Sequence, residues 1–180
     1  MMPGVFSVMM KDDSWNELVK AYRMGAELGE PEAQFRLGSC FANGYGVEQD
    51  KEEAAGWYAK AAEQGYMLAQ AALALCYSFG NGVPMDKEKA FGWYLKAAEQ
   101  GYANAQCNVG NCYELGEGVP VDRAEAAKWY RLAAENGQVD AMIYLAEYYT
   151  AGTGVEKDLE EAAKLYFRAK ELGAEEVPEG

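Results

Sequence analysis

Residues 69–101 read AQAALALCYSFGNGVPMDKEKAFGWYLKAAEQG, and this stretch decides the fold. In its first half an apolar stripe recurs at helical spacing, formed by Ala69, Leu73, Ala74 and Tyr77. Gly80-Asn81-Gly82 then ends the helix, because glycine tolerates the positive φ of a helix C-terminus that runs into a tight turn. The first half therefore predicts an amphipathic α-helix followed by a glycine turn.

The second half of the same stretch predicts another helix. Pro84 prevents the first helix from continuing, and Asp86 is placed to accept hydrogen bonds from the free N–H groups of the helix that follows. This second helix ends at Gly101, and its packing face consists of Ala90, Trp93, Tyr94, Ala97 and Ala98. Together the two halves predict a hairpin of two α-helices.

The hairpin is repeated along the chain. The dipeptide Gly-Val recurs every 36 residues, at Gly46-Val47, Gly82-Val83, Gly118-Val119 and Gly154-Val155. A fixed period of this length indicates one supersecondary unit that is copied and stacked, with its apolar face buried by the neighbouring copies. We therefore predict an all-α solenoid of antiparallel helix hairpins over residues 14–173. A Met-rich leader or cap is expected at 1–13 and an acidic tail at 174–180.

Counting outward from the quoted stretch gives five second helices and four first helices. The second helices are expected to start near Ser14, Asp50, Asp86, Asp122 and Asp158. All of these except Asp86 have a glutamate three residues later, the spacing of a capping box. The first helices are expected to start near Pro31, Met67, Ala103 and Val139.

Tryptophan recurs with the same period in the second helices, at Trp57, Trp93 and Trp129. We interpret these side chains as a core column that fills the gaps between closely packed, alanine-rich helices. Trp15 lies outside this register and is expected to start its helix, and Leu165 replaces tryptophan in the last repeat. Such differences are expected of terminal repeats, because each faces water on one side.

Composition excludes several classes of function. The protein has a formal net charge of −13, which argues strongly against nucleic acid as a partner and disfavours anionic membranes, since Lys and Arg supply most of the affinity for phosphates. With no histidine, the chain has no imidazole metal ligand and no His-based acid–base catalyst. Its acidic pairs lie in first turns of helices, where capping explains them, and no phosphate loop or nucleophile motif is present. We expect no enzyme activity, no metal and no cofactor.

The cysteines and the leader indicate the compartment. Cys40, Cys76 and Cys112 occupy the same position in successive repeats, so stacking separates them by more than the roughly 7 Å that a disulfide allows between Cα atoms. With Cys107, they are expected to be small buried side chains in a reducing environment. Residues 1–10 lack a basic region, are interrupted by Pro3-Gly4 and are too short to span a membrane. The expected location is cytoplasmic, or periplasmic or secreted only if a signal peptide has been removed.

The recurring residues resemble those of a known family. The residues of the quoted stretch are similar to the Sel1-like repeat, a relative of the tetratricopeptide repeat, and the resemblance covers roughly residues 14–173. It implies a right-handed superhelix whose first helices line the concave side, and a role as an adaptor or scaffold for protein complexes. There are two departures from the family pattern. The first-helix cysteines have no counterpart in the second helices, which puts the extracellular role of cysteine-rich members in doubt. Tyr148 and Leu165 replace cysteine and tryptophan in the last repeat.

If the first helices line a groove, as the resemblance implies, the positions beside their apolar stripe face it. These positions vary between repeats, as expected of a surface adapted to an irregular ligand or of neutral drift on an exposed face. The candidate partner-binding residues are Glu32, Phe35, Ser39, Leu68, Ala71, Leu75, Asn104, Cys107, Asn108, Asn111, Asp140, Ile143 and Glu147. Their apolar, amide and acidic groups favour a protein or peptide partner that carries Lys or Arg. We therefore predict a protein-interaction module.

Other interpretations stay open. A homodimer could form through a terminal helix, such as the uncovered face around Leu165, Tyr166 and Leu172, or through the apolar leader. The acidic charge also fits an immunity-type or regulatory protein that neutralises a cognate partner. An alternative of another class is periplasmic binding of cell-wall glycan or peptide, or a hydrolase-like activity.

Overall fold

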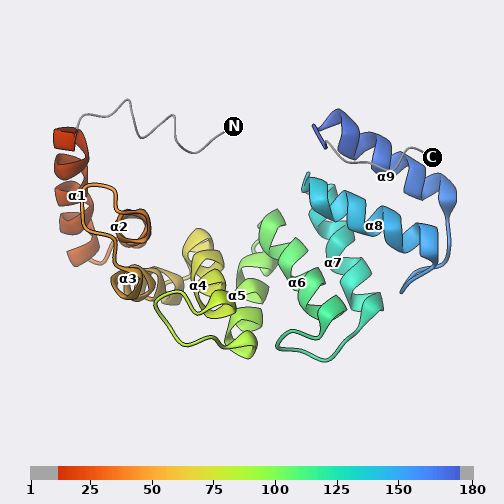
Figure 1. The fold of residues 1–180 in the computed structure, drawn as a ribbon, viewed down its shortest axis with the longest axis horizontal. Helices are drawn as coiled ribbons and strands as arrows, with labels where there is room; N and C mark the ends of the chain where they lie inside the picture. Colours follow the sequence, from red (N-terminus) through yellow and green to blue (C-terminus); the bar gives the residue numbers. More distant parts are fainter. Residues whose placement is uncertain (1–11, 175–180) are drawn as a thin grey trace. The chain divides into compact units, whose positions relative to one another are not determined.

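The computed structural model describes residues 12–174, and the nine secondary-structure elements in that range are all α-helices (Figure 1). They are α1 (Asp12–Glu27), α2 (Pro31–Asn43), α3 (Lys51–Glu63), α4 (Met67–Phe79), α5 (Lys87–Glu99), α6 (Ala103–Leu115), α7 (Arg123–Glu135), α8 (Val139–Ala151) and α9 (Leu159–Glu171). The all-α repeat fold is confirmed, and each helix starts within two residues of its expected position. Most of the predicted leader and tail lies outside the described residues.

Aspartates cap the second helices as their spacing predicts. The Asp50 carboxylate accepts hydrogen bonds from the backbone N–H groups of Glu52 and Glu53, at 2.9 and 3.0 Å. Asp122 and Asp158 cap α7 and α9 in the same way. The prediction that Ser14 caps α1 is wrong, because Asp12 and Asp13 already belong to this helix.

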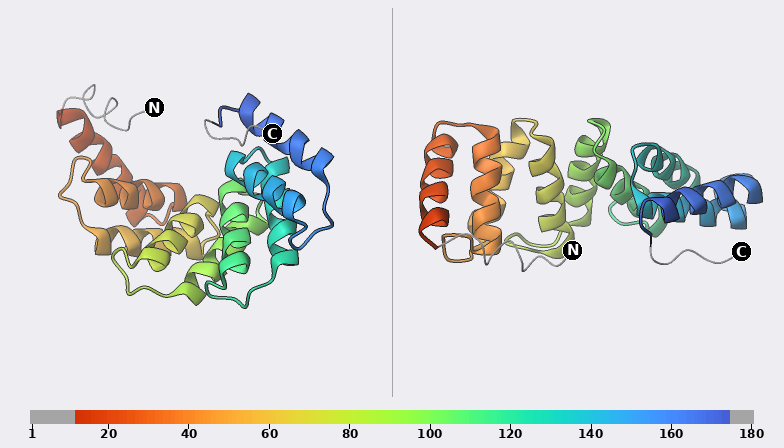
Figure 2. Two further views of the ribbon diagram at one scale, coloured as in Figure 1. Left: turned by 45° about the vertical axis from the view of Figure 1, so that its right-hand side comes forward. Right: turned by 90° about the horizontal axis from the view of Figure 1, so that it is seen from above.

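Contacts group the chain into two compact units, unit 1 (Met1–Asp86) and unit 2 (Lys87–Gly180). Within unit 1, α1 packs on α2, α2 on α3 and α3 on α4. Within unit 2, α5 to α9 pack in chain order in the same manner (Figure 2). The single domain over residues 14–173 and its superhelical form remain predictions, since each unit is described by itself.

The second glycine of each Gly-x-Gly turn brings one repeat against the previous one. Gly118 has a φ of +74°, and a Cβ atom there would lie only 2.1 Å from the carbonyl oxygen of Lys87 at the start of α5. Gly82 approaches the carbonyl oxygen of Lys51 in the same way. The Gly-Val period therefore marks the point where the loop of one hairpin touches the second helix of the hairpin before it.

A buried glutamine links each of the first three hairpins to the helix that precedes it. Gln34, Gln70 and Gln106 donate hydrogen bonds of 3.2–3.3 Å to the carbonyl oxygens of three alanines, Ala26, Ala62 and Ala98. The Gln34 and Gln106 side-chain oxygens also accept hydrogen bonds from Gln64 and Asn136, at 2.8 and 2.9 Å. In the last repeat Met142 and Leu172 occupy these two positions, so this polar pair does not form there. Met142 is buried and Leu172 is 53% exposed.

The prediction that the recurring tryptophans form a column in the core is wrong, because they are less buried than core residues. Trp57, Trp93 and Trp129 are only half-buried. The Lys60 and Lys96 ammonium groups lie 3.7 and 3.9 Å from the ring centroids of Trp57 and Trp93 and cover these rings from outside. The residues that follow the tryptophans, Tyr58, Tyr94 and Tyr130, are buried instead. Tyrosine is therefore the aromatic residue of the core, and tryptophan borders it.

The contact between the start of α1 and the turn that follows α2 is aromatic, whereas the corresponding contacts of α3 and α5 are polar. Trp15 lies near the start of α1 and stacks on Tyr45, with ring centroids 4.8 Å apart. In later repeats the same two positions hold Lys51 with Asn81, and Lys87 with Glu117, at 3.2 and 2.9 Å. Trp15 therefore lies in the first turn of α1 but does not start this helix, which begins at Asp12, so that prediction is wrong. Its side chain takes the place of a lysine in the contact between helix and loop.

Candidate functional site

The predicted partner-binding residues differ widely in exposure. Glu32, Leu75, Asn104, Asp140 and Glu147 are exposed on the first helices α2, α4, α6 and α8. Another six are half-buried: Phe35, Ser39, Leu68, Asn108, Asn111 and Ile143. These eleven side chains therefore supply accessible surface.

Ala71 and Cys107 do not belong to this surface, and their assignment to it is wrong. Ala71 is 8% exposed and Cys107 is 4% exposed. Phe35 occupies the same repeat position in α2 and is half-buried, because a large side chain reaches beyond the helix contact whereas a small one does not. Cys107 packs with Tyr130 and Met142 in the core of unit 2.

Tyrosine hydroxyls of the second helices also border the surface formed by the first helices. The sequence pattern did not predict a role for these hydroxyls. The Tyr58 hydroxyl donates a hydrogen bond of 3.3 Å to the Ser39 hydroxyl. The Tyr130 hydroxyl lies 2.7 Å from Asn111 Oδ1 and 2.6 Å from Glu114 Oε2, and with a single proton it donates to one of them at a time. The signal that could have found them is that a recurring buried tyrosine, unlike phenylalanine, needs a polar partner.

In unit 1 the first-helix surface is aromatic and apolar. The Phe35 ring lies between Tyr58 and Tyr66, with centroid distances of 5.7 and 5.5 Å. A shallow hollow of about 200 Å³ is bordered by side chains that include Tyr58 and Leu75. The one candidate carboxylate of this unit, Glu32, pairs with Arg36 at 3.3 Å, and α4 has no charged residue. This surface therefore suits apolar side chains of a partner.

In unit 2 three tyrosines form a cluster between α7 and α8. The Tyr130 ring lies 5.3 Å from Tyr144 and 5.5 Å from Tyr148, measured between centroids. Gly110 makes room for it, since a Cβ atom at that position would lie 2.5 Å from the Tyr130 ring. Tyr148 fills the position of cysteine in the earlier repeats, so this cluster is specific to the last repeat.

The charge of the first-helix surface in unit 2 is wholly negative. α6 and α8 contain Glu114, Asp140 and Glu147 and no Lys or Arg. On α8, Asp140, Tyr144 and Glu147 follow one another at helical spacing and therefore share one face. Burial raises the pKa of Tyr144, and Asp140, Glu147 and Glu114 raise it further. The surface therefore combines a half-buried aromatic ring with carboxylates.

The cysteines are not suited to nucleophilic chemistry. All four are buried and free, as predicted, while the reducing compartment inferred from them remains a prediction. Burial and Asp140 raise the pKa of Cys107 to about 12, and burial and Glu117 raise that of Cys112 to about 11, so both stay protonated at neutral pH.

Metal binding and membrane insertion find no support in residues 12–174. Three or more Cys, Asp or Glu side chains do not come together there in a way that could hold a metal ion. Over the same range, every helix is too short or too polar to cross a bilayer.

Comparison with protein-family models matches the Sel1 repeat at residues 31–66, 68–102, 103–138 and 139–173. A protective antigen of uropathogenic Escherichia coli with an SLR fold is 41% identical, with a TM-score of 0.84, over 87% of this chain and 33% of that one. A Sel1 repeat protein of Oxalobacter formigenes is 32% identical, with a TM-score of 0.82, over 88% of this chain and 63% of that one.

A more distant structure is that of an immunity protein of Pseudomonas aeruginosa. It is 22% identical with a TM-score of 0.56, over 89% of this chain and 58% of that one, and this similarity shows only a shared fold. The chain thus spans a third of the first relative and less than two thirds of the second. A comparison with curated protein sequences found no match.

Proposed function

Because the chain belongs to the Sel1 repeat family, whose members are typically protein-interaction modules, we propose that it binds a protein segment carrying Lys or Arg on the first helices of unit 2. The observation that carries this proposal is the charge of α6 and α8, which hold three carboxylates and no basic residue. A cationic side chain meets no repulsion from these helices. Opposite charges also speed the encounter of two proteins and fix their orientation.

The α8 face supplies the recognition chemistry. A Lys or Arg side chain placed over the half-buried Tyr144 ring would gain a cation–π interaction of about 0.5–1 kcal/mol at an exposed site. Asp140 and Glu147, one turn on either side of Tyr144, would accept its N–H hydrogen bonds. Asn108 and Asn111 on α6 can bond the backbone of the bound segment. The combination favours Arg over Lys, because a planar guanidinium both stacks on an aromatic ring and donates to two carboxylates.

Unit 1 contributes different chemistry to the same class of function. Its hollow beside Tyr58 and Leu75 would take an apolar side chain, and its candidate glutamate is neutralised by Arg36. Charge reversal is therefore expected to matter at Asp140 and Glu147 and to matter little at Glu32. Neutralisation of a cognate partner would be a special case of the same binding.

The experiment measures binding of synthetic peptides of about 15 residues that differ only in Arg or Lys content, by calorimetry at low and high salt. We expect the double variant Asp140→Lys/Glu147→Lys to weaken binding of the Arg peptide at least tenfold, about 1.4 kcal/mol. The matched control Glu99→Lys/Glu135→Lys makes the same charge change on exposed ends of α5 and α7. Equal binding of Arg-rich and Arg-free peptides, or affinity that is independent of salt, would contradict the proposal.

A further inference from the structure

Glu114, near the end of α6, is the least exposed carboxylate of the first-helix surface in unit 2. It is half-buried, whereas Asp140 and Glu147 on α8 are exposed. The Tyr130 hydroxyl lies 2.6 Å from Glu114 Oε2 and 2.7 Å from Asn111 Oδ1, so two acceptors compete for its single proton. The two acceptor oxygens therefore lie close together and retain lone pairs for a further hydrogen-bond donor.

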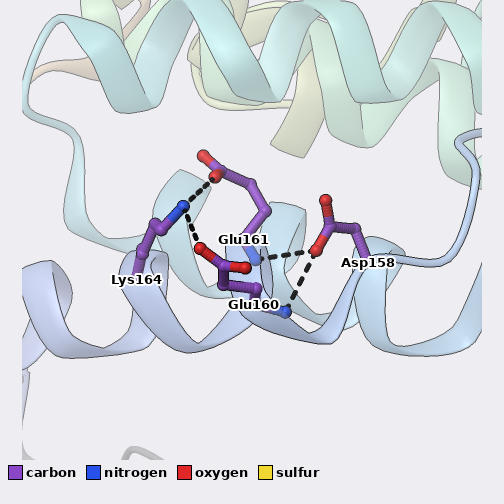
Figure 3. A network of polar contacts seen from close by, with 4 residues as sticks. All are labelled: Asp158, Glu160, Glu161 and Lys164. Carbon is purple, nitrogen blue, oxygen red and sulfur yellow. Dashed lines mark hydrogen bonds and ion pairs between the residues drawn. The ribbon is translucent and has the colours of Figure 1, made fainter.

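Glu114 is also the half-buried glutamate that lacks an ion pair within the part of the chain that the structure describes. The other three half-buried glutamates there each pair with a lysine: Glu117 with Lys87, Glu125 with Lys128 and, as Figure 3 shows, Glu161 with Lys164. α6 and α8 contain no Lys or Arg that could pair with Glu114. Because burial removes hydration from a carboxylate and an opposite charge compensates for that loss, a cation from a partner would stabilise Glu114.

The buried side chain of Tyr148 on α8 is a second group without a partner beside Glu114. Tyr148 is 5% exposed, and its hydroxyl makes no hydrogen bond within the described residues. Burial raises the pKa of Tyr148 and the nearby Glu114 raises it further, whereas Arg123 at the start of α7 lowers it. A buried hydroxyl without a partner is unfavourable, so the polar contacts of this cluster are incomplete.

Glu114 and Tyr148 both depart from the repeat pattern, and they do so at the same place. The position of Glu114 holds Ala42, Ser78 and Thr150 in the other first helices. The position of Tyr148 holds cysteine in the other first helices. Since the other hairpins pack without either residue, packing does not require them. The pair therefore marks a site that is specific to α6 and α8.

We propose that Glu114 and Asn111 bind a second cationic side chain of the partner, next to the one that the α8 face receives. This inference rests on the function proposed above and narrows the partner segment to one with two basic residues. The second Lys or Arg donates one N–H group to the Glu114 carboxylate and another to Asn111 Oδ1. Its charge pairs with the carboxylate that has no counter-ion among the described residues.

The two cation sites adjoin each other. After burial, nearby anionic groups raise the pKa of Tyr144 on the α8 face, and Glu114 is one of them. The Tyr130 ring, whose hydroxyl reaches Glu114, lies 5.3 Å from the Tyr144 ring, measured between centroids. The two basic residues are therefore expected close together in the sequence of the partner.

Calorimetry with two kinds of synthetic peptide tests the proposal. One peptide carries a single Arg, and a series derived from it carries a second Arg at each other position in turn. With the wild-type chain, the second Arg is expected to raise the affinity about tenfold at one or two positions near the first and much less elsewhere. Glu114→Gln should abolish this gain and change the affinity for the one-Arg peptide by less than about twofold. The unchanged affinity also shows that this variant is folded, since its amide oxygen still accepts from Tyr130.

Glu117→Gln is the matched control. It removes one charge from another half-buried glutamate, which lies in the turn after α6 and is already paired with Lys87, so the gain from the second Arg should persist. Asn111→Leu introduces the residue that α4 has at this position, Leu75, and should reduce the gain because it removes an acceptor.

The outcomes separate this inference from the proposed function. An absent gain, an equal gain at every peptide position, or a gain that survives Glu114→Gln would overturn the second site, even where Asp140→Lys/Glu147→Lys weakens binding of the one-Arg peptide. If that double variant leaves binding of the one-Arg peptide unchanged, the proposed function itself is wrong, and the second site with it.

Discussion

Gly118 meets two separate restrictions at once. Its φ of +74° disfavours any residue with a Cβ atom, and that atom would also lie 2.1 Å from the backbone oxygen of Lys87. The obstacle is backbone rather than a flexible side chain, so it cannot move aside without shifting the start of α5. The glycine therefore fixes how closely the loop approaches the preceding second helix.

Gly118→Ala is accordingly expected to lower the free energy of unfolding by about 2–4 kcal/mol, the range of strain at a special backbone position combined with overpacking. The control is Gly92→Ala within α5, where an added Cβ meets no atom within 4 Å. This control should stabilise the protein by about 0.5–1 kcal/mol, because alanine is the better helix former. Urea denaturation measures the free energy of unfolding of the two variants. Equal values would show that Gly118 is not restricted by its backbone conformation and by the contact with Lys87.

Single residues also show where sequence reasoning about the site fails. The repeat pattern predicts that residues recurring in every repeat pack between helices and that residues varying between repeats lie on the surface. Tyr130 belongs to both groups, because its ring packs in the core while its hydroxyl reaches Asn111 and Glu114 at the variable surface. Cys107 is variable in sequence but buried, because its side chain is too short to leave the helix contact. Periodicity alone does not report how far a side chain extends.

At the scale of helices, the last hairpin differs from the others in how it joins its neighbour. Met142→Gln places an amide at a fully buried position, where its Nε2 can donate to the Ala134 carbonyl as Gln106 donates to Ala98. Its oxygen has no donor, because Leu172 occupies the position that Asn136 holds in the previous repeat, so we expect a loss of about 1–3 kcal/mol in the free energy of unfolding. Adding Leu172→Asn recreates the Gln106–Asn136 pair of the previous repeat and should recover most of that loss. Thermal and urea unfolding of the two single variants and the double variant form a double-mutant cycle. Simple additivity would show that the pair is not coupled.

The helices themselves were largely predictable, since glycine turns, aspartate caps and apolar stripes act locally. Asp122 and Asp158 lie immediately before α7 and α9, as their spacing to glutamate predicts. The glutamine link between repeats was not predictable in the same way, because Gln34 and Gln64 are 30 residues apart and meet only after the hairpin forms. The start of α1 was predicted two residues too late, because the Ser14–Glu17 spacing of a capping box lies inside this helix.

At the scale of the whole molecule, the titrating groups of the core are almost all thiols and phenols. The chain has no histidine, so no imidazole titrates between about pH 6 and 7. Burial and Glu114 raise the pKa of Tyr148 to about 12, and burial raises the pKa of Cys107 to about 12 and that of Cys112 to about 11. The Tyr130 pKa is raised by burial and by its hydrogen bond to Glu114. Each of these groups loses its proton more easily in the unfolded chain.

The stability that these groups contribute decreases as the pH rises. A raised pKa in the folded state means that the unfolded chain releases protons first, so these groups stabilise the fold fully below their unfolded pKa values, about 8.5 for Cys and 10 for Tyr. That stability is lost as the pH rises toward 11 and 12, the folded values for Cys112 and for Cys107 and Tyr148. We therefore expect the free energy of unfolding to decrease steeply above about pH 9.

Urea denaturation at a series of pH values from neutral to strongly alkaline measures this decrease. Tyr148→Phe removes one of these groups. Above about pH 10 the free energy of unfolding should therefore fall less steeply with pH, by up to about 1.4 kcal/mol per pH unit, which corresponds to one proton. Phe91→Leu is the control, because this half-buried residue of α5 carries no titrating group, so the change should leave the pH dependence of the free energy of unfolding as in the wild type. Stability that rises with pH in the alkaline range would show that the buried phenols and thiols do not govern it.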